Sequence, residues 1–309
     1  MLDPQAASLN AATRYCAVYG HPIAHSASPA MQNAGLAALG LNWRYLAFAV
    51  HPDRLREAIQ GAKVMGFLGL NLTVPHKLLA LDLVEELDQS ARTWGAVNTI
   101  RFEGRDPQGQ WRPLREWPDN TGITLRAQGF NTDADAILRS LRHDLAVEPA
   151  GTRVLLLGAG GAGRTAALKL ASEAVHTLYL VNRTAAKAAA AAEEIRARFP
   201  HVQVATGYPA AGQTVDLLLN TTSVGLNPED ALPLDTRQFA LARAGAVYDM
   251  IYRPAQTPLL QAARTAGCRT ANGLGMLLYQ GAAALQLWTG QNPPIEVMRD
   301  ALHKHVDHG

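Results

Sequence analysis

The segment "LYLVNRTAAK" at residues 178–187 ends an apolar, strand-like run with side chains that suit an anionic ligand. Arg183 offers a planar fork of N–H donors that matches the geometry of a phosphate. Lys187 follows four residues later, so on a helix it returns a second positive charge to the same place, while Asn182 and Thr184 add neutral hydrogen-bonding groups. The segment predicts a phosphate site; the alternative is that Arg183 and Lys187 are solvated surface residues.

A glycine-rich turn upstream favours the phosphate site. "VLLLGAGGAG" places Gly158, Gly160 and Gly163 in the G-x-G-x-x-G spacing, after a buried strand and before a helix. The glycines permit a tight turn, the approach of a pyrophosphate to the backbone, and close packing of helix on strand. An acid at the end of the next strand would bind ribose hydroxyls and repel a phosphate. Arg183 at that place therefore predicts NADP rather than NAD as the cofactor.

A second set of reactive side chains lies in the first half of the chain. "NLTVPHK" supplies Asn71, Thr73 and Lys77, with Lys77 in an apolar neighbourhood where its charge is costly unless paired. A partly desolvated lysine in a cleft can work as an acid or a base. "GFNTD" adds Asn131 and Asp133. The alternatives are an exposed lysine on a short helix and an ordinary helix cap at Thr132 or Asp133.

Two serines precede a predicted helix in "GHPIAHSASPAMQN", residues 20–33. The hydroxyls of Ser26 and Ser28 can donate to a small carboxylate, helped by the helix N-terminus. The alternative is that Ser28 only caps that helix.

The elements that must position these side chains alternate between strand-like and helix-like segments, which predicts an α/β fold. The pattern restarts after "GFNTDADAILRSLRHDL", a linking helix with Ile137, Leu138, Leu141 and Leu145 on one side. Residues 103–128, rich in Gly, Pro, Asp and Arg, interrupt the rhythm and predict an extended hairpin or loop. The segment from Gly273 to about Val306 is helical, with a break at Pro293 and Pro294.

Composition excludes several classes of protein. The 309 residues suffice for two domains, and the formal net charge of +2 comes from Lys and Arg spread through the chain. Neither a nucleic-acid partner nor a membrane surface is expected. We expect a cytoplasmic protein, because the chain starts without a signal peptide and has no apolar run long enough to span a bilayer. Cys16 and Cys268 have no spacing that suits a metal, so we expect two reduced thiols and no metal.

Nine segments, in chain order, carry a resemblance to a known family: "GHPIAHSASP", "GLNLTVPHK", "GAVNT", "GFNTD", "GAGGAG", "NRT", "NTTSVGL", "DMIYRPAQTPLL" and "GLGMLLYQGAAALQLWTG". They closely resemble the shikimate dehydrogenase family. The resemblance implies the reversible, NADPH-dependent reduction of the ring ketone of 3-dehydroshikimate to shikimate. It also implies a substrate-binding domain at residues 1–132, completed by the returning C-terminal helices at 273–309, and a Rossmann-type NADP-binding domain at 133–272, with the active site in the cleft between them.

The resemblance further implies residue roles. Lys77 and Asp133 match the catalytic pair, with Lys77 as proton donor and Asp133 holding it. Substrate binders are matched by Ser26, Ser28, Thr73, Lys77, Asn98, Asp133, Tyr252 and Gln280. Cofactor binders are matched by Gly158, Ala159, Gly160, Gly161, Ala162, Gly163, Asn182, Arg183, Thr184, Lys187, Thr221, Met250 and Gly273. The partner is a small molecule, and the chain is expected to be a monomer or a homodimer.

Three features depart from the family pattern. A glycine frequent after "NTD" is Ala136, a histidine frequent in the serine-loop helix is Gln32, and residues 103–128 lengthen the connection between two pocket motifs. Two alternatives therefore stay open. One is a quinate/shikimate or aminoshikimate dehydrogenase, and the other is a non-catalytic NADP-binding sensor.

Overall fold

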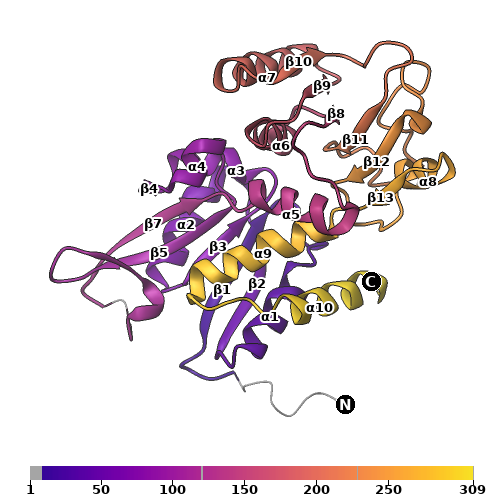
Figure 1. The fold of residues 1–309 in the computed structure, drawn as a ribbon. Helices are drawn as coiled ribbons and strands as arrows, with labels where there is room; N and C mark the ends of the chain where they lie inside the picture. The colour runs from indigo at the N-terminus through magenta and orange to yellow at the C-terminus, as the bar shows by residue number, and fades with distance from the viewer. Residues whose placement is uncertain (1–8, 120, 228, 309) are drawn as a thin grey trace. The chain divides into compact units, whose positions relative to one another are not determined.

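The computed structural model describes residues 9–119, 121–227 and 229–308 (Figure 1). It divides the chain into two compact units. The first unit comprises the described residues through Asp133 together with those from Leu278 onward, and the second comprises Ala134–Leu277. Each unit has its own sheet, and each is described by itself below.

The sheet of the first unit has seven strands, with β2-β1-β3-β5-β7-β4 as its main order and β6 paired to β5. β1, β2 and β3 are parallel to one another, whereas β5 is antiparallel to β3, β6 and β7. The bounds are β1 Arg14–Gly20, β2 Trp43–Ala49, β3 Gly69–Leu72, β4 Glu86–Leu87, β5 Thr99–Arg105, β6 Trp111–Pro113 and β7 Thr124–Phe130.

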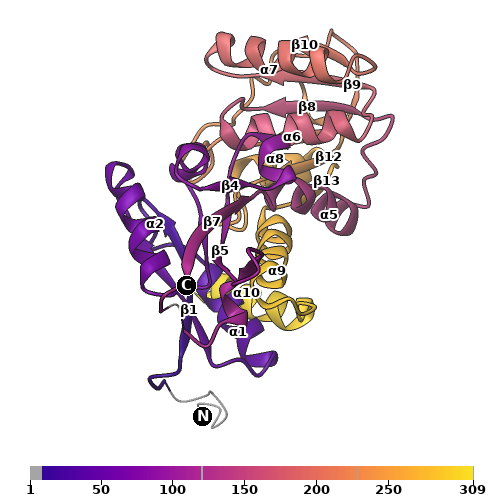
Figure 2. The same cartoon turned by 90° about the vertical axis from the view of Figure 1, so that its left-hand side faces the viewer.

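Helices cover both faces of this sheet. Figure 2 shows α2 on one side and α1, α9 and α10 on the other. Trp288 of α9 reaches the sheet, where its indole N–H donates to the carbonyl of Ile100 at 2.9 Å. The bounds are α1 Ser28–Ala38, α2 Leu55–Val64, α3 His76–Leu79, α4 Gln89–Trp94, α9 Leu274–Thr289 and α10 Ile295–His308, with short 3-10 turns η1 Pro52–Arg54, η2 Ala80–Asp82 and η3 Leu114–Glu116.

Residues 103–119 and 121–128 form a hairpin extension of this sheet, as the sequence predicts. β5 and β7 pair along their whole length, and β6 adds a short third strand. The Arg14 guanidinium fixes the connection by donating to the carbonyls of Leu114, Arg115 and Trp117. Burial lowers the pKa of Arg14, but three carbonyl acceptors compensate the desolvated cation. The extension is thereby tied to the first strand of the unit.

The second unit is built around a six-stranded parallel sheet with the order β10-β9-β8-β11-β12-β13. Numbered within the unit, this order is 3-2-1-4-5-6, which is that of the Rossmann fold. Its strands are β8 Arg153–Leu157, β9 Thr177–Val181, β10 Gln203–Thr206, β11 Val215–Asn220, β12 Ala244–Asp249 and β13 Arg269–Ala271. Its helices are α5 Asp133–Leu145, α6 Gly161–Ser172, α7 Ala185–Arg198 and α8 Pro258–Thr265, with η4 at Leu241–Arg243.

The predicted linking helix is α5, and its apolar side is confirmed as a core face. Ile137, Leu138, Leu141 and Leu145 are all buried. Ala136, at the position where the related family often has glycine, is also buried, so its methyl group has room inside the fold. No helix in the described part of the chain is long and apolar enough to cross a membrane.

Two Gly→Ala substitutions in the first unit should change the stability of the protein in opposite directions. A Cβ at Gly69 of β3 would lie 2.0 Å from Trp288 Nε1 and 2.5 Å from the Ile100 carbonyl oxygen. Gly69→Ala should therefore destabilise the protein by about 1–3 kcal/mol or more through overpacking. Gly61→Ala in α2, where the nearest atom would lie at 3.9 Å, should stabilise it by about 0.5–1 kcal/mol. Urea unfolding of both variants measures the difference, and equal effects would contradict the packing.

Candidate functional site

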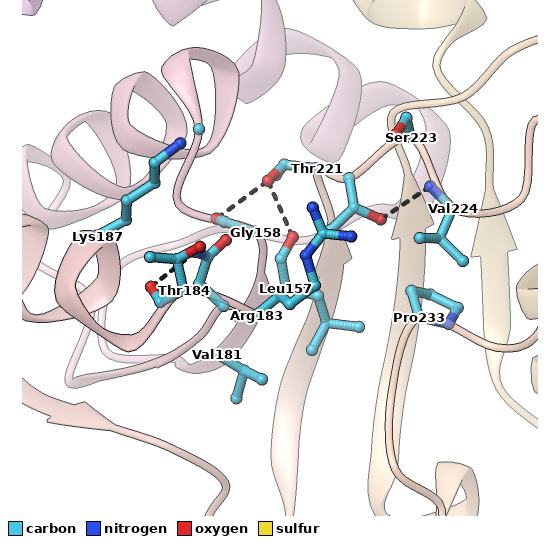
Figure 3. A pocket seen from close by; sticks show the side chains of 13 residues that line it. Leu157, Gly158, Val181, Arg183, Thr184, Lys187, Thr221, Ser223, Val224 and Pro233 are labelled. Carbon is cyan, nitrogen blue, oxygen red and sulfur yellow. Dashed lines mark hydrogen bonds between the residues drawn. The ribbon is translucent and has the colours of Figure 1, made fainter.

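A cavity of about 430 Å³ opens at the carboxyl ends of the second unit's strands (Figure 3). β8, β9 and β11 end there, at the point where the strand order reverses, which is where ligands bind in sheets of this kind. The lining residues are Leu157, Gly158, Gly160, Val181, Asn182, Arg183, Thr184, Lys187, Thr221, Thr222, Ser223, Val224 and Pro233. The predicted residues Ala159, Gly161, Ala162, Gly163, Met250 and Gly273 are not part of this lining.

The glycine turn at this cavity has the geometry that the sequence pattern requires. Gly158 adopts φ of +104°, a conformation that side-chain-bearing residues rarely take. A Cβ at Gly163 would lie 2.2 Å from the Gly158 carbonyl oxygen, so the third glycine lets α6 pack against the turn. A Cβ at Gly160 or Gly161 would meet no atom within 4 Å. The N-terminus of α6 thus faces open space, as the approach of a pyrophosphate to the backbone demands.

Asn182 links the glycine turn to the "NRT" segment. Its Oδ1 accepts a hydrogen bond from the N–H of Ala159 at 2.9 Å, and its Nδ2 donates to the carbonyl of Thr184 at the same distance. The amide oxygen is therefore used within the protein. Asn182 shapes the site by holding the two segments together.

Arg183 and Lys187 give the cavity its positive charge. Both side chains are exposed, and Figure 3 shows them with Thr184 around Gly158, with Arg183 extending toward the loop that carries Ser223 and Val224. None of the described residues that line the cavity is acidic. Two cations, several hydroxyls and an unobstructed helix N-terminus suit the phosphates of a dinucleotide.

The remaining predicted cofactor residues lie at the ends of neighbouring strands in the same unit. The Thr221 hydroxyl donates to the Leu157 carbonyl at 2.9 Å and also contacts the Gly158 carbonyl at 3.1 Å, which ties β11 to the glycine turn. The Met250 N–H donates to the Asn220 carbonyl at 2.9 Å, and a Cβ at Gly273 would lie 2.1 Å from the Met250 carbonyl oxygen. Gly273 is required for this close approach.

The first unit holds an ion pair between the two predicted catalytic side chains. Lys77 Nζ on α3 lies 2.7 Å from Asp133 Oδ2, and the side chains are 29% and 11% exposed. The second carboxylate oxygen, Oδ1, accepts a hydrogen bond from Asn98 Nδ2 at 2.9 Å. Asp133 therefore holds both a cation that retains access to solvent and a buried amide.

Polar side chains beneath this pair form a network that sequence reasoning recognised only in part. Asn98 Oδ1 accepts from the Thr132 N–H at 2.8 Å and contacts the Thr99 hydroxyl at 3.3 Å. Asn71 Nδ2 donates to Thr99 Oγ1 at 3.0 Å, and the Tyr45 hydroxyl donates to Asn71 Oδ1 at 2.7 Å. Sequence reasoning missed Thr99 and Tyr45. Their strand segments carried no signal that distinguished them from ordinary core residues.

The two predicted serines lie together at the start of α1. Ser26 Oγ accepts from the Ser28 N–H at 3.4 Å, and Ser28 is buried. The interpretation of Ser28 as a capping side chain is wrong, because the N-cap of α1 is Ala27 and no side chain caps it. Neither hydroxyl is therefore used as a cap of this helix.

A hydrogen bond from Gln32 joins α1, the helix that begins with Ser28, to α9, the helix that carries the predicted residue Gln280. The Gln32 Nε2 donates to the carbonyl of Gly281 at 2.9 Å, and Gln280, the preceding residue, is half-buried. Thr73 follows β3, and its N–H donates to the Tyr19 carbonyl at 2.9 Å.

Tyr252, expected among the substrate residues, lies in the second unit. The described residues contain no cluster of His, Cys, Asp and Glu that could hold a metal ion.

Three family models match this chain. The model of the shikimate dehydrogenase substrate binding domain matches residues 18–100, that of shikimate / quinate 5-dehydrogenase matches residues 141–224, and that of the shikimate 5'-dehydrogenase C-terminal domain matches residues 273–303. A shikimate dehydrogenase (NADP(+)) of Methanopyrus kandleri is 41% identical over 305 residues, which is 97% of this chain and 98% of the relative.

Solved structures agree over nearly the whole length. A shikimate dehydrogenase in complex with NADP+ matches with a TM-score of 0.81 and 34% identity, over 97% of this chain and 98% of that one. A 5-ketofructose reductase of Gluconobacter matches with a TM-score of 0.77 and 32% identity, over 95% of this chain and 99% of that one. The Thermus thermophilus shikimate 5-dehydrogenase in complex with NADP(H) and shikimate matches with a TM-score of 0.76 and 34% identity, over 94% of this chain and 99% of that one. Sequence and fold together show that the chain belongs to the shikimate dehydrogenase family.

Proposed function

We propose that Lys77 and Asp133 carry out the acid–base chemistry by which this NADP-dependent shikimate dehydrogenase interconverts 3-dehydroshikimate and shikimate. The observation that carries the proposal is the 2.7 Å ion pair between Lys77 and Asp133, with the other carboxylate oxygen held by Asn98. Bound NADPH supplies the hydride that reduces the ring ketone. As the ketone is reduced, negative charge develops on its oxygen, which an adjacent ammonium both stabilises and protonates.

Each member of the pair has a distinct task. Lys77 gives the proton from Nζ to the developing alkoxide oxygen, and in the reverse direction it takes the proton from the substrate hydroxyl. Asp133 keeps Nζ in place, since its Oδ2 accepts from the ammonium, while Asn98 fixes the carboxylate through Oδ1. Positioned acids of this kind contribute about 10²–10⁴-fold to a rate.

Ser26 and Ser28 are proposed to bind the ring carboxylate. They lie together at the N-terminus of an eleven-residue helix, where the amide groups favour an anion. Thr73, Asn98, Asp133 and Gln280, all in the first unit, are proposed partners for the ring hydroxyls. A carboxylate anchored at one end fixes which ring carbon is presented to the hydride.

Arg183 and Lys187 are proposed to bind the adenosine phosphate that distinguishes NADP from NAD. The cavity that they line has no acid to accept ribose hydroxyls among its described residues. The pyrophosphate is proposed to lie over Gly160 and Gly161, where nothing obstructs the backbone. Asn182 supports this arrangement by holding Ala159 and Thr184.

Two other functions compete with this proposal. A quinate-preferring enzyme would share the fold and the Lys77–Asp133 chemistry, and the 5-ketofructose reductase shows that similar chains act on other ketones. A non-catalytic sensor would bind NADP but would not need a paired lysine in the first unit. The ion pair favours an enzyme.

Initial rates with four pairs of substrates test the proposed specificity. Purified protein is given shikimate or quinate with NADP+ or NAD+, and the reduced cofactor is followed by absorbance. We expect fast turnover with shikimate and NADP+ alone. Preference for quinate or NAD+ would contradict the specificity and leave the chemistry intact, whereas no turnover in any pair would support the sensor.

The proton-donor role predicts that Lys77→Ala lowers kcat by roughly 10²–10⁴-fold. Shikimate binding should change less, because the serines and the ring-hydroxyl partners remain. Lys63→Ala is the matched control, since Lys63 also forms a close ion pair, with Glu85, in the same unit. It should lower stability and leave kcat near that of the parent. Near-normal turnover by Lys77→Ala would remove Lys77 from the mechanism.

The phosphate-binding role predicts that Arg183→Ala weakens NADPH binding by about 1.5–3 kcal/mol, roughly 10- to 150-fold in Kd. NADH lacks the phosphate, so its affinity should change little. Arg196→Ala, a surface control on α7, should affect neither cofactor. Titration calorimetry with both cofactors measures the difference, and equal losses for NADPH and NADH would show that Arg183 serves the fold.

A further inference from the structure

Five polar side chains lie buried beneath the Lys77–Asp133 pair in the first unit. Tyr45, Asn71, Asn98 and Thr99 are at most 5% exposed, and Thr132 is 8% exposed. A buried polar atom without a partner costs about 1–3 kcal/mol. Each of these groups therefore takes the orientation in which its neighbours satisfy it, and the orientation of one side chain constrains the next.

The donors of this network run in one direction, toward Asp133. Tyr45 has a single hydroxyl proton, and it donates to Asn71 Oδ1 at 2.7 Å. Because the amide oxygen of Asn71 accepts this bond, its Nδ2 faces the other way and donates to the Thr99 hydroxyl at 3.0 Å and to the Asn98 backbone carbonyl at 3.3 Å. The first link thus sets the direction of the second.

The direction continues to the carboxylate. Having accepted from Asn71, Thr99 Oγ1 can donate to Asn98 Oδ1 at 3.3 Å, with Thr132 Oγ1 at the same distance. Asn98 Oδ1 also accepts from the Thr132 N–H at 2.8 Å. That leaves Asn98 Nδ2 to donate to Asp133 Oδ1 at 2.9 Å, while Lys77 donates to Oδ2. Hydrogen bonds aligned in this way in a low-dielectric interior polarise and strengthen one another.

The other side of Tyr45 connects to the proposed carboxylate site. Ser28 lies close enough to the phenol to influence its protonation. Burial raises the pKa of Tyr45 well above its usual value, so the phenol keeps the proton that the network requires. The backbone of Tyr45 is fixed as well, because its N–H and carbonyl bond to Asn33 of α1 at 2.9 Å each. The helix that begins with Ser28 and the strand that carries Tyr45 are thus joined.

We propose that Tyr45 is a positioning residue for the substrate site. Its hydroxyl orients the Asn71 amide, and through Thr99 and Asn98 it orients the Asp133 carboxylate that holds Lys77. Its backbone is bonded through Asn33 to the helix that begins with Ser28. Tyr45 touches neither substrate nor cofactor in this role. The inference rests on the proposed function, because it explains how that function's residues are held.

Tyr45→Phe tests this inference, since it removes the hydroxyl and keeps the ring that packs on Trp288 at a centroid distance of 6.0 Å. We expect kcat/KM for shikimate to fall about ten-fold, mostly through a higher KM, as for a lost hydrogen bond that leaves an acceptor unsatisfied. The KM for NADP+ should stay within about two-fold, because the cofactor residues lie in the other unit. A merely structural role would not separate the two KM values.

Tyr248→Phe is the matched control. Its phenol is equally buried and forms a hydrogen bond of 2.8 Å to Ser140, but it lies in the second unit. Both Tyr→Phe variants should lose thermal stability, and only Tyr45→Phe should raise the KM for shikimate. An equal rise in both variants would overturn the inference.

A double-mutant cycle shows whether Tyr45 acts through Asn71. Asn71→Ala should lower kcat/KM for shikimate at least as much as Tyr45→Phe, and adding Tyr45→Phe to Asn71→Ala should change it less than about two-fold further. The positioning role would be overturned if the parent turns over shikimate but Tyr45→Phe leaves kcat/KM unchanged. It would also be overturned if the fold-losses of the two single variants multiply in the double variant. Absence of turnover in the parent would overturn the proposed function and this inference together.

Discussion

A nearly buried carboxylate needs a partner for each of its oxygens, and at Asp133 these partners are Lys77 and Asn98. Asn98 is itself held by Thr132 and Thr99, and the backbone of Lys77 is held by the Val97 N–H, which donates to its carbonyl. The cost of leaving any of these groups unsatisfied exceeds the net gain from one hydrogen bond. The first unit therefore places a lysine ammonium at a fixed point with access to solvent, and the polar interior around it follows from that requirement.

The site of the second unit depends on positions without side chains, whereas that of the first unit depends on buried polar side chains. At Gly158 and Gly163 the backbone approaches too closely for a Cβ, and at Gly160 and Gly161 the same absence leaves open space beside a helix N-terminus. The charged groups are then added at the surface by Arg183 and Lys187. A phosphate ligand brings its own charge and hydration, so its site can stay exposed, whereas proton transfer to a ketone oxygen needs a donor held in a fixed orientation.

Local patterns in the sequence predicted the features that depend on neighbouring residues. The glycine turn, the apolar side of α5 and the hairpin at 103–128 each follow from a pattern within one continuous segment of the chain, and the structure confirms them. The two-residue β4 and the three-residue β13 were missed, since such short strands have no periodicity to detect. The links from Tyr45 to Asn71 and from Asn71 to Thr99 span 26 and 28 residues. Only the pairing of β1, β2, β3 and β5 brings these side chains together, and composition alone gives no sign of it.

The contrast between the two sites also determines how substitutions in each should combine. Arg183 and Lys187 act on a ligand through solvent-exposed contacts, so salt screens their contributions. In the first unit the orientation of each buried polar side chain depends on its neighbours in the network, so removing one link disturbs those that follow. Coupling energies in such networks reach about 0.5–3 kcal/mol. Changes of cofactor preference are therefore accessible one residue at a time, whereas a change of the acid–base site requires several buried side chains to change together.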